Sequence, residues 1–181
     1  IRDRSIDGYG DVLNYQRFPI KWEQAKKNLD KLDLFAQENK NIMCWIAFTV
    51  TVNNVFHLPE FIKWKVSSSG WKKINSTLRR PIITHHVAHG PKRMNIKILP
   101  PKIKEDLEKY YESWKNVYRG EFDELRQEKA CKILDSVLQF AKSEDYSDSL
   151  QSFVNFTKYL DKTRKQDIRK VVPRLKELFN D

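Results

Sequence analysis

The chain has 181 residues, and its 34 basic and 24 acidic side chains give a formal net charge of +10 at pH 7. Hydrophobic residues make up 40% of it, a share that excludes an intrinsically disordered chain. No apolar run approaches the ~18 residues that a membrane span needs, so we expect a soluble protein without a membrane partner. The length suits one domain, or one domain with a small appendage.

The positive charge makes nucleic acid a possible partner, because each phosphate that a basic side chain neutralises releases a counterion. The basic residues are interspersed with acidic ones, however, as between Lys102 and Lys115, and this is typical of solvated helix faces. A basic α/β module that binds nucleic acid or a protein without catalysis is therefore an alternative hypothesis. It requires one contiguous lysine and arginine surface.

The two cysteines, Cys44 and Cys131, lie in an apolar run and in a helical pattern, so we expect both to be small core residues. Two separate cysteines without a secretory leader fit the reducing cytoplasm. His85 and His89 offer only two imidazoles, which is too few for a zinc site, so no metal site is expected. Neither a Gly-x-Ser-x-Gly elbow nor a phosphate-binding loop is present in the sequence.

The first elements in chain order are a strand end, a turn and a helix. Residues 5–29 begin as the polar end of a strand, turn through Gly8 and Gly10 and enter an amphipathic helix, whose apolar positions are Trp22, Ala25, Leu29 and Leu32. Residues 42–52 form a nearly unbroken apolar and β-branched run, which predicts a central parallel strand buried on both faces. A helix follows from Leu58, with Pro59 placed early, where its missing N–H costs nothing.

Residues 71–80 are interpreted as an irregular connection. Residues 82–88 predict a third strand, and residues 94–99 a short strand or extended segment before Pro100 and Pro101. Everything after Lys102 has helical spacing. Three apolar stripes indicate three helices, a break is expected at Gly120, and Pro173 should bend or restart a last helix over residues 168–179.

Strands that alternate with helices require parallel crossovers, so the sequence predicts an α/β fold. A closed eight-unit barrel takes about 250 residues, and three or four units can form only part of one. We therefore predict a partial, half TIM-type barrel over residues 1–101, followed by an α-helical tail over residues 102–181. The open edge of such a sheet predicts self-association or coverage by the tail.

A spaced set of residues near the amino end comprises Ser5, Asp7, Gly8, Gly10, Tyr15, Arg17, Pro19, Trp22, Asn28 and Leu29. Together with segments 57–61, 96–101, 156–164 and 172–176, this set resembles the twitch-domain group of the radical S-adenosylmethionine (radical SAM) superfamily. The resemblance covers nearly all of the chain. It implies the carboxyl-terminal part of a partial barrel and a twitch-like tail.

The same resemblance implies that the chemistry of the parent lies elsewhere. The family cleaves S-adenosylmethionine with a 4Fe–4S cluster on a Cys-x3-Cys-x2-Cys motif. This chain has only Cys44 and Cys131, 131 − 44 = 87 positions apart, and it starts at Ile1 directly on a motif. We interpret it as a truncated protein or partial reading frame that binds S-adenosylmethionine weakly or not at all and is inactive alone. The intact parent would act through a radical on an unknown peptide or small-molecule substrate.

Five residues are candidates for the cofactor site. By resemblance, Ser5 and Asp7 face the ribose and amino-acid parts of the cofactor, although an ordinary Asp-Gly turn is the alternative. Arg17 resembles the arginine that holds the cofactor carboxylate, a role that suits its planar fork of donors, and a surface arginine is its alternative. Thr51 and Asn53 end the second strand, where they would either border the same cleft or cap a helix.

Overall fold

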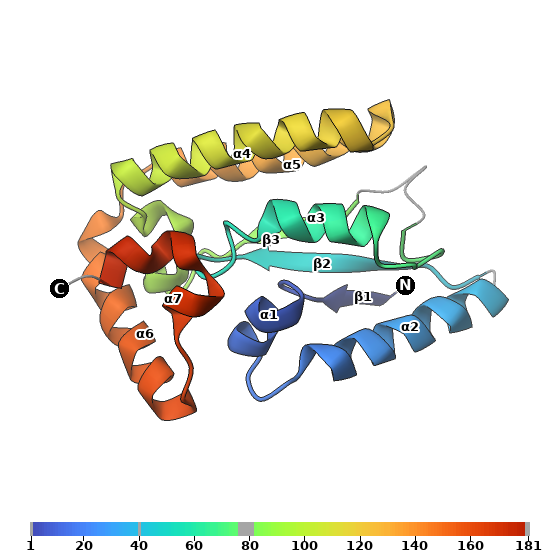
Figure 1. Cartoon of the computed structure of the whole chain (residues 1–181), viewed down its shortest axis with the longest axis horizontal. Coiled ribbons are helices and arrows are strands. Elements are labelled where there is room, and N and C mark those ends of the chain that lie inside the picture. Colours follow the sequence, from blue (N-terminus) through green and yellow to red (C-terminus); the bar gives the residue numbers. More distant parts are fainter. Residues whose placement is uncertain (1, 40, 76–81, 180–181) are drawn as a thin grey trace.

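In the computed structural model, which describes residues 2–39, 41–75 and 82–179, a small parallel sheet is surrounded by helices (Figure 1). Strands β1 (Arg2–Ser5), β2 (Cys44–Val50) and β3 (Thr84–Val87) form it in the order β1-β2-β3. The central position and burial predicted for the run at residues 42–52 are confirmed by β2. In the described part β1 pairs with β2 alone, and the predicted self-association through its other edge stays a prediction.

The helices before residue 101 connect the strands. Helices α1 (Gly10–Gln16) and α2 (Trp22–Glu38) lie between β1 and β2, and α3 (Leu58–Ser67) follows β2 with Pro59 in its first turn. The sequence predicted α2 and α3 but missed α1. Residues 71–75 are irregular, as predicted, and the rest of that predicted connection, residues 76–80, lies outside the described residues.

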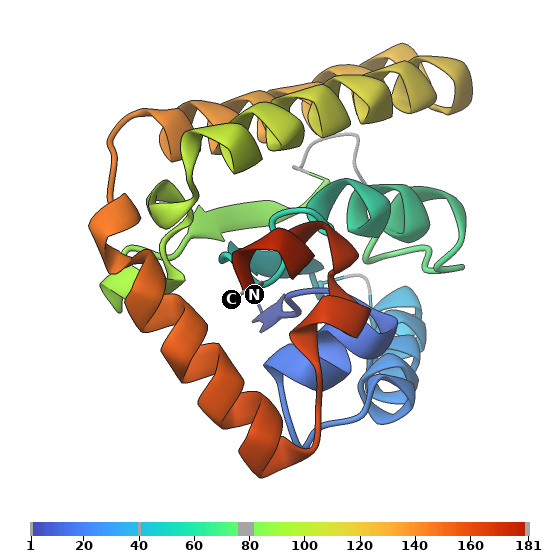
Figure 2. The ribbon, with the colours of Figure 1, turned by 60° about the vertical axis from the view of Figure 1, so that its left-hand side comes forward.

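The helices after residue 100 begin with two long ones, α4 (Pro101–Glu121) and α5 (Glu124–Lys142), which lie side by side (Figures 1 and 2). Helix α4 continues through Gly120, where a break was expected. The Asp123 side chain caps α5 by accepting the Arg126 N–H at 2.9 Å. A short 3-10 turn, η3 (Ser147–Ser149), leads into α6 (Leu150–Arg164), and α7 (Ile168–Val171) follows. Pro173 then starts the final 3-10 helix, η4 (Pro173–Phe179).

The predicted half TIM-type barrel is wrong, because the described chain is mostly helical around three short strands. Where residues 94–99 were expected to be extended, the chain forms two 3-10 helices, η1 (Lys92–Met94) and η2 (Ile96–Ile98). The Asn95 side chain accepts the Lys97 N–H at 3.0 Å and so starts the second of them. The long helices that follow lead to no further strand in the described part.

A single hydrophobic cluster contains buried side chains from both sides of residue 101, among them Ile46, Phe61, Leu107, Leu134 and Phe153. The proposed division at residue 101 stays a prediction. Within the described residues, the helices are too short or too polar to cross a membrane.

Lys65 on α3 is fully buried, and its Nζ donates to the Ile74 carbonyl at 3.2 Å and to Asn75 Oδ1 at 2.9 Å. Burial, followed by the charge of Arg126, lowers the pKa of Lys65 from 10.5 to about 7. Above pH 7 the folded chain therefore binds fewer protons at this site than the unfolded chain, and stability rises with pH until the unfolded lysine also loses its proton.

We expect the free energy of unfolding to rise between pH 7 and pH 9, by at most about 1.4 kcal/mol per pH unit from this group. Urea titrations at several pH values measure it. Lys65→Met should remove the rise, whereas Lys63→Met, which changes the surface partner of Glu121, should keep it. An identical pH slope in wild type and Lys65→Met would contradict the expectation.

Candidate functional site

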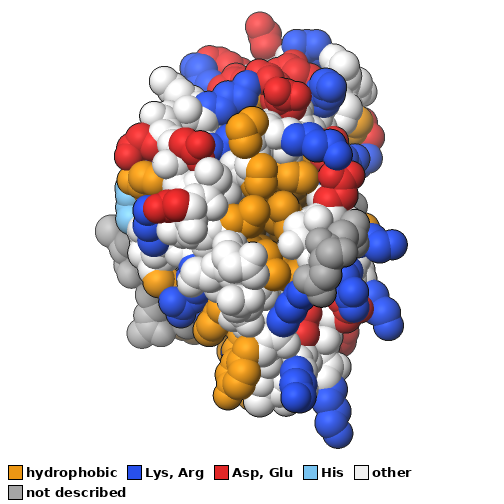
Figure 3. All heavy atoms as spheres, turned by 90° about the vertical axis from the view of Figure 1, so that its left-hand side faces the viewer, with side chains coloured by type: hydrophobic (Ala, Val, Ile, Leu, Met, Phe, Trp, Pro, Cys, Tyr) orange, Lys and Arg blue, Asp and Glu red, His pale blue; other side chains and the backbone are white. Residues whose placement is uncertain are grey.

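The three strands end at the same side of the molecule, where α6, α7 and η4 also lie (Figure 1). Figure 3 views this side and shows hydrophobic side chains gathered at its centre, with basic and acidic side chains intermixed around them. Ligands of parallel sheets bind at the carboxyl ends of the strands, so polar residues there are the first candidates.

Ser5, Asp7 and Arg17, which we call the Arg17 cluster, meet just beyond β1. Arg17 donates through Nη2 to Ser5 Oγ at 2.6 Å and through Nε to Asp7 Oδ2 at 2.8 Å, and its guanidinium forms an ion pair with Asp7. The other Asp7 oxygen accepts the Thr49 N–H of β2 at 2.9 Å. The structure thus brings together three of the five predicted site residues.

Local backbone geometry folds Arg17 back onto the strand end. Gly8 has a φ of +152° and Gly10 a φ of +56°, conformations that favour glycine, and they turn the chain from β1 into α1. Helix α1 is only seven residues long, and Arg17 caps its carboxyl end by donating its N–H to the Leu13 carbonyl at 2.8 Å. Arg17 therefore lies beside Ser5 although twelve positions separate them.

A groove of about 660 Å³ lies beside the cluster. Ser5 and Arg17 contribute to its polar part, together with Gln24 and Asn28, and the remaining lining is apolar: Ile6, Leu13, Ile20, Ala25, Leu29 and Leu32. Ser5 is exposed and the Arg17 side chain is 38% exposed, whereas Asp7 is buried and both of its carboxylate oxygens have partners. Direct contact with a ligand therefore falls to Ser5 and Arg17, and Asp7 positions the guanidinium.

Thr51 and Asn53 do not line this groove. The buried Asn54 connects the end of β2 to the cluster instead, because its Nδ2 donates to the Asp7 carbonyl at 3.0 Å and to the Thr49 carbonyl at 2.9 Å. Its Oδ1 accepts the Thr51 N–H at 2.7 Å. Asn54 was expected at this edge of the sheet, as a second asparagine directly after a buried strand, but it was not among the predicted site residues.

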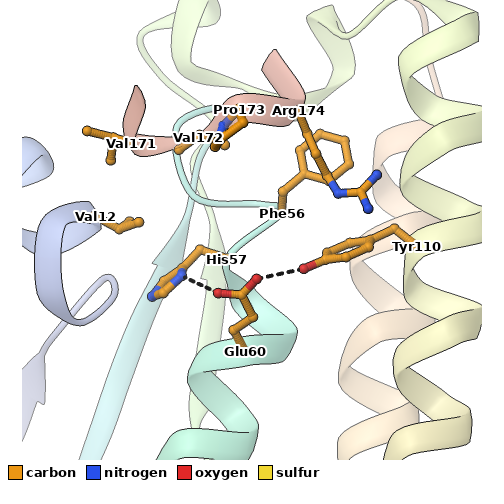
Figure 4. A pocket seen from close by; sticks show the side chains of 9 residues that line it. All are labelled: Val12, Phe56, His57, Glu60, Tyr110, Val171, Val172, Pro173 and Arg174. Atoms are coloured by element: carbon orange, nitrogen blue, oxygen red, sulfur yellow. Dashed lines mark hydrogen bonds and ion pairs between the residues drawn. The ribbon is translucent and has the colours of Figure 1, made fainter. Parts of the chain in front are cut away.

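A second cavity, of about 510 Å³, lies between α1, α3, α4 and the carboxyl-terminal segment (Figure 4). We call it the Glu60 cavity, because the Glu60 carboxylate points into it between His57 and Tyr110. Glu60 Oε1 accepts the Tyr110 hydroxyl at 2.8 Å, and Oε2 lies 3.4 Å from His57 Nδ1. Two hydrogen bonds lower the pKa of Glu60, of which the one from His57 has a larger effect than the one from Tyr110. Glu60 is therefore ionised at neutral pH.

The wall opposite Glu60 comes from the end of the chain. The Arg174 guanidinium lies 4.0 Å from the centre of the Tyr110 ring, and its Nη1 donates to both oxygens of Asp106 at 3.2 and 3.0 Å. Burial raises the pKa of Tyr110 to about 12, so its hydroxyl keeps its proton at neutral pH. The other lining residues are Val12, Phe56, Val171, Val172 and Pro173.

The predictions named none of this cavity's residues as site residues. The sequence could have indicated two of them, His57 and Glu60. They lie three positions apart at the start of a helix, and this spacing places their side chains on one face. Arg174 gave no signal, since 174 − 57 = 117 positions separate it from His57.

The two cysteines and the three histidines other than His57 lie apart from both cavities. Cys44 is buried, as predicted, and Cys131 is half-buried against the hydrophobic cluster. His85 Nε2 lies 2.9 Å from Ser136 Oγ. Among residues 2–39, 41–75 and 82–179, there is no group of three or more metal-ligating side chains.

Comparison of the chain with models of protein families, with curated proteins and with solved structures finds no match.

Proposed function

We propose that this chain is the carboxyl-terminal part of a radical S-adenosylmethionine enzyme, and that the Arg17 cluster with its groove forms one wall of the cofactor site. One observation carries the proposal: a guanidinium is held between a buried carboxylate and an exposed serine, at the carboxyl end of a parallel strand. Residues that resemble the family's cofactor-binding positions thus come together beside an apolar groove.

The chemistry of the cluster fits the polar groups of S-adenosylmethionine. Arg17 has guanidinium donors beyond those given to Ser5 and Asp7, and these suit the cofactor carboxylate. The Ser5 hydroxyl suits a ribose hydroxyl, and the apolar groove excludes water from the less polar parts of the ligand. When a reduced iron–sulfur cluster cleaves it, S-adenosylmethionine supplies a radical that abstracts hydrogen from a substrate. The two cysteines of this chain are too few to hold such a cluster, so we expect weak cofactor binding and no radical chemistry from this chain alone.

Isothermal titration calorimetry with S-adenosylmethionine tests the proposal. We expect weak, saturable binding by the wild-type chain and about tenfold weaker binding by Arg17→Lys, which keeps the charge but loses the planar fork. Arg126→Lys is the matched control, because the Arg126 side chain is 43% exposed and pairs with Asp123 at the start of α5, outside the groove, and binding by this variant should equal that of wild type. Equal binding by wild type and Arg17→Lys would contradict the proposal.

A mobility-shift titration with duplex DNA distinguishes the alternative of a basic binding module. Binding at low salt that weakens steeply as salt rises would favour that module. We expect no shift, because the ion pairs of the described residues give many basic side chains an acidic partner, as in Lys92 with Asp148 and Lys132 with Glu128.

A further inference from the structure

Glu60 is held by partners from two sides. His57 approaches one carboxylate oxygen and the Tyr110 hydroxyl donates to the other, so the carboxylate is fixed before any ligand arrives (Figure 4). The side chain is nevertheless 43% exposed, which leaves room for a further donor. A carboxylate that is already oriented loses little conformational entropy when it binds.

Among the described residues, no lysine or arginine forms an ion pair with the Glu60 carboxylate. Its ion pair is with His57 Nδ1, and His57 Nε2 accepts the Tyr9 N–H at 3.2 Å, which places a ring proton on Nδ1. Arg174 is the one arginine among the lining residues; its charge also lowers the pKa of Glu60, but its ion pair is with Asp106. The cavity therefore presents an ionised carboxylate that a cationic ligand would neutralise.

The rest of the cavity is suited to an apolar stem. Phe56, Val172 and Pro173 lie across the cavity from the carboxylate, and Val12 lies on the side of His57 (Figure 4). A volume of about 510 Å³ falls within the range of small-molecule sites, which combine apolar walls with a few fixed polar groups.

We propose that the Glu60 cavity binds a primary ammonium group carried on an apolar stem, with the ammonium donating to the Glu60 carboxylate and the stem packing against Phe56, Val12 and Val172. Two sources share this chemistry, a small aralkyl amine and the side chain of a lysine in a peptide. The site is separate from the Arg17 cluster, and its ligand binds without S-adenosylmethionine.

Amide chemical shifts of the full chain, titrated with phenethylamine at neutral pH, test the proposal. We expect saturable shifts at residues around the cavity and at least about fivefold weaker binding of phenethyl alcohol, which has the same stem without the charge. Nα-acetyl-lysine methylamide, titrated in parallel, tells the sources apart. Tighter binding than phenethylamine identifies a lysine side chain, and weaker binding a free amine. Equal affinity for phenethylamine and phenethyl alcohol would overturn the proposal.

Two variants test the site independently. Glu60→Gln keeps the shape and removes the charge, and it should weaken phenethylamine binding about tenfold. Glu121→Gln, at an exposed carboxylate outside the cavity, should leave binding unchanged. Val171→Phe fills the cavity from the half-buried end of α7 and should abolish binding while Glu60 stays intact. Unchanged binding in either Glu60→Gln or Val171→Phe overturns the assignment. Because the assay contains no S-adenosylmethionine, its failure leaves the Arg17 cluster untouched.

Discussion

Replacing Gly8 with alanine should lower the free energy of unfolding by about 3 kcal/mol. Gly8 has a φ of +152°, where an L side chain is strained, and a Cβ there would lie 2.9 Å from Val12 Cγ1 and 3.1 Å from His57 Cδ2. Backbone strain and overpacking each cost about 1–3 kcal/mol. Urea unfolding followed by circular dichroism measures the change.

Substitutions at two other glycines separate the cost of backbone strain from the cost of overpacking. Gly10 has a φ of +56° and open space around its Cβ position, so Gly10→Ala should show the backbone cost alone, about 1 kcal/mol. Gly120 lies in α4 with open space and no positive φ, and Gly120→Ala should stabilise the chain by up to about 1 kcal/mol. If Gly8→Ala costs no more than Gly10→Ala, the close approach to Val12 and His57 carries no energy.

Asp33→Ala should destabilise the chain by about 4 kcal/mol. Asp33 is buried on α2, and its carboxylate accepts three backbone N–H groups, from Lys72 at 2.9 Å and from Lys73 and Ile74 at 2.8 Å each. Alanine would leave these donors without their acceptor in the interior. Thermal and urea unfolding should both report the loss.

Asp30→Ala is the matched control, one turn earlier on the same helix. The Asp30 side chain is 42% exposed and accepts the Trp71 indole N–H at 2.8 Å, so its removal should cost about 1 kcal/mol. Equal losses for the two variants would mean that the three backbone donors find water instead of remaining unpaired.

The sequence was informative wherever a regular period ran long enough. The unbroken apolar run around Phe48 correctly predicted the central strand, and the helical stripes after residue 101 correctly predicted α4, α5 and α6. Where elements are short, the sequence pattern predicted the wrong secondary structure. The alternation around Ile96 and Ile98 resembles a strand, but the Asn95 side chain starts a 3-10 helix there. Counting that segment as a strand contributed to the incorrect barrel.

The Arg17 cluster and the Glu60 cavity also differ in how far the sequence could predict them. Ser5, Asp7 and Arg17 could be grouped in advance because they lie within one strand, turn and helix. The Glu60 cavity could not, because it needs α3, α4 and the last segment to pack together, and periodicity does not specify that packing.

The residues that complete the Glu60 cavity are synthesised after the residues that they cover. Pro173 follows Glu60 by 173 − 60 = 113 positions, and Arg174 comes directly after it. A nascent chain would therefore expose Tyr110 and Phe56 without their cover until Pro173 and Arg174 have been made. Chaperones that recognise apolar surface would meet this hollow during biogenesis, before it could hold any ligand.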